Sequence, residues 1–370
     1  MALTRLAVLF GGISPEHEVS IITAVQLMKH VDRERYEVMP IYIDKSGQWW
    51  TGESLLDVNY FKTADLFHPS DLQSTAISPV KGRNPFDVAL LCFHGLYGEA
   101  GNIQGLLELA GIPYQGPGVL SSAMCFDKVV LRQILAAENI AQPDYMWFSA
   151  HSWATDQQRY LDQAAALNWP VFVKPANGGS TIGIVRAKTE AEFISAVEQV
   201  VQYDDRIIVE AEVKDCIEVN VSVLGYEGHT RASVPEQPIK ADEFLSYADK
   251  YERGGGKKSG MASASRRIPA PISESLTKKV QAMAQHVFTT LDCSGVVRID
   301  FMVNPSDESV IVIEPNTIPG SMSFYLWEAS GLPYPQLIDE LVKIAFARAK
   351  NESSFITSFE SNILKMKKSL

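Results

Sequence analysis

The sequence predicts a mixed fold of the α/β and α+β classes, which opens with an α/β domain built on a parallel sheet. Over the first 120 residues, short apolar runs rich in β-branched residues alternate with helical segments, which is the pattern of βαβ units. From Ser121 the pattern changes to a helix followed by closely spaced strands. A length of 370 residues, 46% of them hydrophobic, is enough for two or three domains with their own cores.

Composition excludes several classes of protein. The formal net charge of −11 argues against a nucleic-acid-binding surface, because no basic stripe offsets it. The four cysteines lie far apart with no C-x-x-C pair, so neither a disulfide framework nor a zinc site is indicated. The N-terminal apolar run has no cleavage-site pattern, and no later run reaches transmembrane length. We therefore expect a cytoplasmic protein with no membrane partner.

The first domain begins with a buried strand over 6–10 that ends in a Gly-Gly turn. The residues that follow have the form of a helix start, with Ser14 as the cap and Pro15 at the first helical position. Glu18 would then lie in the first turn, beside the carboxyl end of the strand, where open α/β sheets bind ligands. The alternative is that its carboxylate only stabilises the helix dipole. The helix should reach about His30. Further strands are predicted at 36–43 and 88–93, and the last strand of the domain with its exit turn at 112–118.

A glycine-rich loop runs from His94 to Gly101, directly after a buried strand. Such a loop suits close approach of the backbone to a ligand, although an ordinary connection between a strand and a helix is the alternative. The Gly11-Gly12 turn is not a dinucleotide-binding fingerprint. The pattern G-x-G-x-x-G is absent, and no acidic residue closes a second strand at the required distance.

A second glycine-rich loop follows the apolar run Val-Phe-Val at 171–173, and Lys174 lies between that strand and the loop. Backbone N–H groups in such a loop can surround phosphate oxygens while the lysine neutralises them. A surface hairpin is the alternative, but it explains poorly why a lysine follows the apolar run directly. Helices are predicted on either side of this unit, at 127–135, 157–167 and 189–201.

The rest of the chain alternates strands with polar segments. Strands are predicted at 206–210 and 218–224, where Glu210 and Glu218 could accept hydrogen bonds from an adenine amine or from ribose hydroxyls, or could simply be solvated. The long loop over 244–260 is rich in Gly and Lys, and we interpret it as a lid rather than as disorder. The remaining predicted segments are an amphipathic helix at 274–291, a closing helix at 340–349 and a polar, lysine-rich tail over 351–370.

The most informative stretch is a predicted hairpin over 296–314, in which two β-branched runs flank an Asn-Pro turn. Arg298 and Asp300 alternate with apolar residues and so share one face. Glu314 and Asn316 can point the same way across the ladder. Oxygens from an Asp, a Glu and an Asn suit Mg²⁺ bound together with substrate phosphates. A solvated sheet face carrying an Arg–Asp pair is the alternative.

The turn after this hairpin, over 316–323, has backbone N–H groups next to the predicted metal site and could hold an oxyanion. In combination, the motifs resemble the ATP-grasp superfamily. The matching residues are Lys174 with its loop, Glu210, Glu218, Arg298, Asp300, Glu314 and Asn316.

Additional motifs narrow the resemblance to the D-alanine–D-alanine ligase family. These are Glu18 in His-Glu-Val-Ser, His94-Gly95 with Gly98-Glu99, Asp127-Lys128, Ser180 and Lys250-Tyr251. The resemblance covers residues from about 5 to 350, in the same order as in the family. It implies a three-domain ATP-grasp architecture. The implied parts are an N-terminal α/β domain over 1–120, a central subdomain over 121–210, a C-terminal subdomain over 211–350 with a lid at about 241–264, and a tail over 351–370.

The resemblance also implies an activity for peptidoglycan precursor synthesis. ATP would phosphorylate the carboxylate of a first D-alanine, and the amine of a second would attack the acyl phosphate. Two Mg²⁺ or Mn²⁺ ions would offset the phosphate charge. A homodimer in the cytoplasm is expected. The implied roles are nucleotide binding by Lys128, Lys174, Glu210, Glu218 and Lys250; metal binding by Asp300, Glu314 and Asn316; catalysis by Glu18, Ser180, Tyr251, Arg298 and the Gly320 N–H; and a substrate contact by His94. Ser321 or Ser323 is the candidate for the contact with the carboxylate of the second substrate, because the serine that the family uses is absent.

Two positions depart from the family pattern. Tyr325 stands where the family usually has a serine that contacts the carboxylate of the second substrate, and Ala100 replaces the aspartate of Gly-Glu-Asp-Gly. The first departure leaves open a ligase for another second substrate, such as D-lactate or D-serine. Tyr251 favours the dipeptide, since members that make the ester tend to lack it. A nucleotide-binding protein without catalysis is the other alternative, and the complete metal trio together with Arg298 disfavours it.

Overall fold

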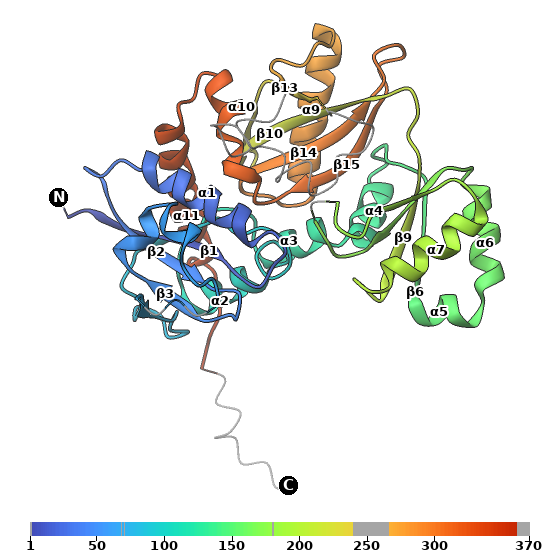
Figure 1. Ribbon diagram of the computed structural model, residues 1–370. Helices are drawn as coiled ribbons and strands as arrows, with labels where there is room; N and C mark the ends of the chain where they lie inside the picture. Colours follow the sequence, from blue (N-terminus) through green and yellow to red (C-terminus); the bar gives the residue numbers. More distant parts are fainter. Residues whose placement is uncertain (1, 68, 70, 180, 240–265, 361–370) are drawn as a thin grey trace, which may run out of the picture.

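The computed structural model describes residues 2–67, 69, 71–179, 181–239 and 266–360, and these form three bodies, each built around a sheet. Figure 1 shows the N-terminal body in blue, the central body in green and the C-terminal sheet in yellow and orange. The C-terminal helices return to the N-terminal body. The predicted α/β and α+β fold is thereby confirmed.

The N-terminal sheet has the order β4-β3-β2-β1-β5. The central strand β1 pairs in parallel with β2 and β5, whereas β3 and β4 are antiparallel, so the sheet is mixed rather than purely parallel. The reason is local: after β2 the chain reverses in a tight turn, closed by Asp44 N–H donating to the Gln48 carbonyl at 2.9 Å. The elements are β1 (Thr4–Gly11), α1 (His17–His30), β2 (Tyr36–Ile43), β3 (Trp49–Thr51), η1 (Glu53–Leu56), η2 (Tyr60–Lys62), β4 (Gln73–Ser74), β5 (Val88–Leu91) and α2 (Asn102–Ala110).

Two local predictions in this domain need correction. The helix α1 begins at His17 rather than at Pro15, because residues 14–16 form a turn in which His17 N–H donates to the Ser14 carbonyl at 3.2 Å. Of the strand and exit turn predicted over 112–118, the strand is reduced to a single parallel bridge between Ala89 and Tyr114. The chain leaves the sheet there and enters α3 (Val119–Phe126).

The central sheet, of order β6-β9-β7-β8, is antiparallel throughout. Its core contains Phe148, Val173 and Val209 from the strands and Phe193 from a covering helix, all of them buried. Thr189, the first residue of the helix predicted over 189–201, instead caps it: its hydroxyl accepts the Glu192 N–H. The elements are β6 (Tyr145–Ser149), α5 (Ala150–Thr155), α6 (Gln157–Ala166), β7 (Val171–Pro175), β8 (Val185–Ala187), α7 (Glu190–Val200) and β9 (Arg206–Ala211).

The C-terminal sheet, of order β11-β10-β14-β15, has one apolar and one polar face. The valines of β10 alternate with polar residues, and the apolar set packs on α9 in a shared core, to which α4 also contributes Leu131 and Leu135. The polar set lies on the other face. The elements are α4 (Lys128–Ala137), β10 (Ile217–Tyr226), β11 (His229–Ala232), β12 (Gln237–Pro238), β13 (Arg266–Arg267), α9 (Glu274–Thr290), β14 (Gly295–Val303) and β15 (Val310–Asn316).

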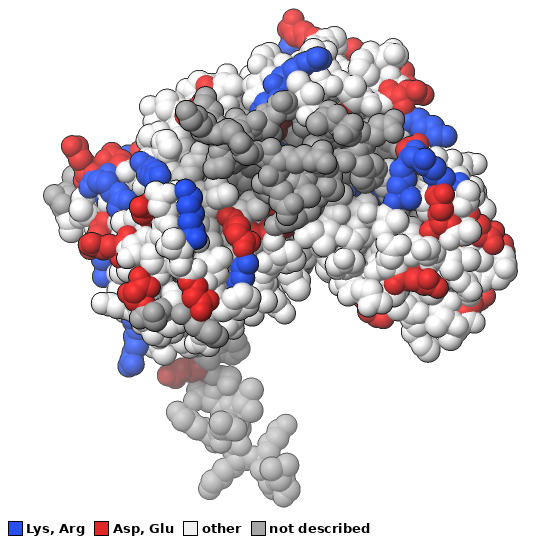
Figure 2. Space-filling model, in the orientation of Figure 1, with Lys and Arg blue, Asp and Glu red and all other residues white. Residues whose placement is uncertain are grey.

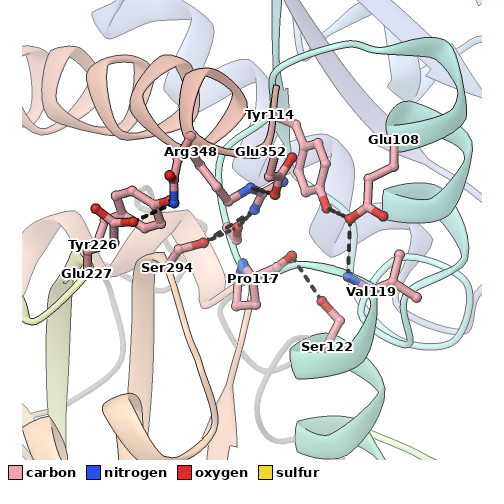
Figure 3. Close-up of polar contacts among 12 residues, drawn as sticks. Glu108, Tyr114, Pro117, Val119, Ser122, Tyr226, Glu227, Ser294, Arg348 and Glu352 are labelled. Atoms are coloured by element: carbon pink, nitrogen blue, oxygen red, sulfur yellow. Dashed lines mark hydrogen bonds and ion pairs between the residues drawn. The ribbon is translucent and has the colours of Figure 1, made fainter. Parts of the chain in front are cut away.

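The last helices join the C-terminal sheet to the N-terminal core. After η4 (Gly320–Ser323) and α10 (Phe324–Ala329), the helix α11 (Tyr334–Glu352) buries its apolar face in the N-terminal core, where it contacts β5 and also β10 and β14 of the C-terminal sheet. This helix starts earlier than the predicted 340–349, because Tyr334, Leu337 and Ile338 already belong to the buried face. Near its end, Arg348 contacts the chain segment that links the N-terminal domain to α3 (Figure 3).

Charged side chains of both signs are interspersed over the described surface visible in Figure 2, and a notch separates the N-terminal body from the central one. No helix in the described ranges is both long and apolar enough to cross a membrane.

Candidate functional site

The predicted hairpin exists and its polar side chains share one face. The strands β14 and β15 are antiparallel, with Arg298 opposite Asn316 and Asp300 opposite Glu314. Arg298 donates from Nε to Oδ1 of Asp300 at 2.7 Å and from Nη2 to Oδ2 at 2.8 Å. Asn316 Nδ2 donates to Asp300 Oδ2 at 3.1 Å. The tertiary structure therefore brings the four predicted residues together.

The chemistry of this face suits a divalent cation. Burial raises the pKa of Asp300 to about 6, although Arg298 opposes the rise, and the charges of Glu314 and Glu218 add to it. Buried carboxylates that repel one another are stabilised when they bind a cation that prefers oxygen ligands. Within the described ranges, no three His, Cys, Asp or Glu side chains are grouped to hold a metal by themselves. Asp300 and Glu314 would therefore need oxygens from the Asn316 amide or from a bound phosphate.

The second glycine-rich loop faces this sheet from the central body. Lys174 lies at the end of β7, and its Nζ pairs with Glu210 Oε2 at 2.5 Å. Lys128 opens α4, and its buried Nζ donates to the Gly178 carbonyl of the loop at 2.6 Å. Burial lowers the pKa of Lys128, while the charge of Glu314 raises it, so Glu314 of the hairpin lies near this lysine.

Glu210 is not solvated, which was one of the two environments expected from its position at the end of a strand. Only 2% of the residue is exposed, and Arg132 Nε donates to its Oε1 at 2.8 Å while Lys174 occupies Oε2. Burial alone would raise the pKa of Glu210, but the two cations hold it well below its usual range. Glu210 thus positions Lys174, a task that the sequence does not reveal. Its expected contact with an adenine amine remains a prediction, as does the contact of Glu218 with ribose.

The carboxyl ends of β1 and β5 provide the third side of the site. Glu16 is 6% exposed, and a methyl group added at Gly179 would meet its Oε2 at 2.9 Å, so its carboxylate adjoins the second glycine-rich loop. Glu99 accepts the Gly95 N–H at 2.7 Å. Burial raises the pKa of Glu99 to about 8, with the charge of Glu16 adding to the rise. Two carboxylates therefore converge where adjacent parallel strands end, which is where open sheets bind ligands.

The structure does not bring Glu18 into this group. Its carboxylate pairs with Lys45 at 2.5 Å, and 51% of its side chain is exposed. Because α1 starts at His17, Glu16 lies before the helix and turns toward the loop, whereas Glu18 follows the outer face of the helix. A sequence signal for Glu16 exists in hindsight: it lies directly after the turn that ends the first strand.

His94 and Ser321 are linked through Thr23 of α1. Thr23 Oγ1 lies 3.1 Å from His94 Nε2 and accepts the Ser321 N–H at 3.3 Å. Burial lowers the pKa of His94 to about 4, and the charge of Arg298 lowers it further, so His94 is neutral at pH 7. Ser321 Oγ donates to Gln26 Oε1 at 2.7 Å.

The turn after the hairpin is unusual in its backbone. Ser321, Met322 and Ser323 all have positive φ angles, of 52°, 55° and 49°. Left-handed conformation in non-glycine residues costs about 1–2 kcal/mol each, and such strain is concentrated at functional sites. Ser323 is fully buried, and no described residue gives its hydroxyl a hydrogen-bond partner. Gly320 begins this turn, as the oxyanion prediction requires, but the oxyanion itself stays a prediction.

Tyr325 occupies a closed environment next to this turn. Its hydroxyl donates to Glu236 Oε1 at 2.8 Å, and Arg266 lies with its guanidinium carbon 3.9 Å from the ring centroid. Arg266 Nη1 also donates to Glu236 Oε2 at 3.0 Å. The tyrosine hydroxyl is therefore engaged with protein and does not simply replace a serine hydroxyl. Ser180, Lys250 and Tyr251, and the predicted lid over 241–264, lie outside the described residues.

The comparison with known proteins agrees with this geometry. Models of the D-ala D-ala ligase N-terminus and C-terminus match residues 5–117 and 134–343, respectively. The chain belongs to the D-alanine–D-alanine ligase family. It is therefore a ligase of the ATP-grasp type, as its resemblance implied.

Relatives in this family match over almost their full length. The D-alanine–D-alanine ligase of Thermosipho africanus is 37% identical, with 99% of both chains covered, and that of Clostridium acetobutylicum is 38% identical, covering 93% of this chain and 98% of the relative.

Solved structures of the family share the fold. The D-alanine–D-alanine ligase of Coxiella burnetii has a TM-score of 0.77 at 32% identity, covering 95% of this chain and 97% of that one. The VanG D-Ala:D-Ser ligase of Enterococcus faecalis has a TM-score of 0.79 at 28% identity, covering 93% and 100%. The Bacillus anthracis ligase, a structure of which contains ATP, has a TM-score of 0.69 at 27% identity, covering 94% and 99%.

Proposed function

We propose that this ligase joins two D-alanines into D-alanyl-D-alanine at the expense of ATP, for peptidoglycan precursor synthesis. One observation supports the proposal in addition to family membership: all three bodies contribute charged groups near the second glycine-rich loop. Lys128 and Lys174 adjoin the glycine-rich loop. Glu314, which lies opposite Asp300 in the hairpin, is close enough to Lys128 for its charge to act on that lysine. Glu16 reaches the same loop from the N-terminal domain. Phosphates, cations and a substrate ammonium require this combination of charges.

The roles follow from charge and position. Lys128 and Lys174 would bind phosphate oxygens of ATP, with Lys174 held in place by Glu210. Asp300, Glu314 and Asn316 would hold two Mg²⁺ or Mn²⁺ ions, which neutralise the phosphoryl group as it transfers. The first D-alanine carboxylate attacks the γ-phosphorus and ADP leaves, and then the second D-alanine amine attacks the acyl carbon and phosphate leaves. Arg298 and the Gly320 N–H would stabilise the oxyanion of that second step.

Substrate positions are assigned by the remaining groups. Glu16, rather than Glu18, would hold the ammonium of the first D-alanine, because only Glu16 faces the loop. His94 is neutral and linked to Ser321, so the pair would contact substrate by hydrogen bonds rather than by charge. Ser323, whose buried hydroxyl has no hydrogen-bond partner among the residues described, is the other candidate for substrate contact. Ser180, Tyr251 and Lys250 keep the roles that the family resemblance implies.

A different second substrate is the alternative, and Tyr325 is the observation that favours it. Its hydroxyl is bound to Glu236, so the pocket lacks the serine hydroxyl that the family usually offers there. The similarity to a D-Ala:D-Ser ligase keeps D-serine among the candidates. We further propose that the enzyme acts in the cytoplasm as a homodimer, because ATP is its energy source and the family resemblance implies both properties.

The test is ADP release measured with each amino acid, in both chiral forms, as sole substrate and in pairs. We expect release with D-alanine alone and none after chelation of divalent cations. Asp300→Asn and Glu314→Gln should abolish turnover in folded protein. ADP release that requires a second amino acid would assign the alternative, and near-parental turnover by both variants would exclude the metal assignment.

A further inference from the structure

A row of three oxygen-bearing side chains crosses the polar face of the C-terminal sheet. In the register of the strands, Asn220 of β10 lies opposite Asp300 of β14, which in turn lies opposite Glu314 of β15. Figure 1 shows β10, β14 and β15 side by side in this sheet. Residues opposite one another on neighbouring strands point to the same face, so Asn220 shares the face of the two carboxylates.

The backbone of Asn220 brings its side chain especially close to Asp300. Asn220 N–H donates to the Glu236 carbonyl at 2.9 Å, and the Asn220 carbonyl accepts the Glu236 N–H at 2.9 Å. Both groups thus point away from β14. The Asn220–Asp300 pair is therefore of the non-hydrogen-bonded type, in which side chains of antiparallel strands lie nearest to one another.

The amide oxygen of Asn220 has no hydrogen-bond partner in the part of the chain that the structure describes. The residue is 4% exposed, and no donor among the described residues reaches its Oδ1. Buried acceptors are almost always satisfied, and an exception indicates an ion, a water or a ligand that the protein alone does not supply. The two bonds to Glu236 hold the strand in place, so the side chain cannot leave this position by a small backbone shift.

A cation at this face needs more oxygen ligands than the charged residues supply. Mg²⁺ takes six oxygens, and the row contains only two carboxylates. Arg298 occupies both oxygens of Asp300 with hydrogen bonds, which reduces the lone pairs left for a metal. Without the cation a third carboxylate would add repulsion beside Asp300, whereas a neutral amide oxygen supplies a ligand at no such cost.

We propose that Asn220 is an additional binding residue of the cation site, whose Oδ1 supplies an oxygen to the divalent cation held by Asp300 and Glu314. The inference rests on the proposed function, because it takes the cation from that function. It adds a residue on a third strand, so that the cation site spans β10, β14 and β15.

The test measures Mn²⁺ affinity rather than turnover, by electron paramagnetic resonance of free Mn²⁺, with protein saturated by an ATP analogue that cannot be hydrolysed. Asn220→Ala should weaken Mn²⁺ binding about tenfold or more, which is the size of loss seen when a residue that supports a metal site is removed. Asn220→Asp should retain it, because a carboxylate oxygen remains. Affinity for the nucleotide in the presence of a chelator should stay unchanged in both variants.

Gln104→Ala is the matched control, since Gln104 is also buried with an Oε1 that lacks a donor within the described residues, but it lies on α2 of the N-terminal domain. It should leave Mn²⁺ affinity unchanged. Parental Mn²⁺ affinity in Asn220→Ala, or a tenfold loss in Asn220→Asp, would overturn the inference. An equal loss of metal-free nucleotide affinity would also overturn it, by assigning the oxygen to a nucleotide donor. Failure of the proposed function is a separate result, seen as absence of ADP release from the parent.

Discussion

Two glutamates in the same short segment show that the position at which a helix starts decides which side chain is buried. Glu16 and Glu18 are two positions apart, yet Glu16 is 6% exposed beside the glycine-rich loop, whereas Glu18 pairs with Lys45 at the surface. The difference arises because the helix begins at His17. Residues before a helix start can turn inward, while those in its first turn follow the helical surface.

The first prediction separates the two carboxylates. Glu16→Gln should raise the KM for D-alanine by about tenfold or more, because an ammonium loses a charged hydrogen bond. Glu18→Gln is the matched control and should stay within about twofold of the parent. Steady-state ADP release against D-alanine concentration gives both values. If Glu18→Gln has the larger effect, Glu16 is not the ammonium ligand.

The second prediction concerns Glu99, whose pKa is raised by burial to about 8. In the unfolded chain a glutamate titrates near 4.3, so between these values the folded state binds more protons than the unfolded one. The contribution of Glu99 to stability therefore falls as pH rises from about 5 to about 8. Relative to Glu99→Gln, the parent should lose free energy of unfolding on the order of 4 kcal/mol across this range.

Urea unfolding of both proteins at several pH values measures this difference. Asp87→Asn is the control, because Arg5 lowers the pKa of Asp87 by a hydrogen bond and that carboxyl stays ionised in both states over the same range. A difference between parent and Glu99→Gln that does not change with pH would contradict the assignment of a raised pKa to Glu99.

At the scale of elements, one buried arginine joins a helix to two sheets. Arg132 of α4 is 2% exposed and donates to Glu210 of β9, to the Val312 carbonyl at 3.2 Å and to the Ile313 carbonyl at 2.8 Å, both on β15. The planar guanidinium meets these acceptors in different directions, which the single charge of a lysine cannot do. The contacts hold Glu210, and with it Lys174, at a fixed distance from the β14–β15 hairpin.

The third prediction tests this connection. Arg132→Met should lower the free energy of unfolding by about 3–5 kcal/mol, because it leaves a buried carboxylate with one cation and two carbonyls without donors. Arg132→Lys should recover only part of the loss. Arg186→Met is the control, since the Arg186–Glu212 pair is more exposed, at 30% and 24%, and should cost about 1 kcal/mol or less. Equal losses in both variants, measured by urea unfolding, would contradict this account.

At the scale of the whole molecule, α11 determines how the N-terminal domain meets the rest. Figure 3 shows Arg348 between Tyr114 and Ser294, where the linker crosses from one body to the next. Arg348 Nη1 donates to the Gly116 carbonyl, and its guanidinium carbon lies 3.9 Å from the Tyr114 ring centroid. Gly295 approaches the same linker so closely that an added methyl group would lie 2.8 Å from the Gly116 nitrogen.

The fourth prediction is that Arg348→Met lowers the free energy of unfolding by about 3 kcal/mol, from a lost charged hydrogen bond and a lost cation–π contact. Lys343→Met on the same helix is the control. The side chain of Lys343 is 62% exposed in its pair with Glu340, and it should change stability by about 0.5 kcal/mol or less. Similar stabilities for the two variants would show that the linker contact is not needed.

The sequence alone determined the elements and the chemistry that each carries. Alternation with a period of two places Arg298 and Asp300 on one face of β14. The lysine that precedes a glycine-rich loop predicts Lys174 as a candidate phosphate-binding residue. Both patterns can be read from the sequence because they depend only on neighbours along the chain. The antiparallel hairpin, α1 as far as His30 and the strand over 36–43 follow from the same local rules.

Only the tertiary structure decided which of these groups meet. Glu16 rather than Glu18 adjoins the glycine-rich loop, and Arg132 and Lys174 share Glu210. Asn220 lies opposite Asp300 with an amide oxygen that no described residue contacts by a hydrogen bond. These partners come from segments far apart in sequence, and the pattern of apolar residues along the chain does not show which distant segments come into contact. Burial and pairing depend on how the sheets pack against one another, since a side chain's partners are set by the space that the whole fold leaves around it.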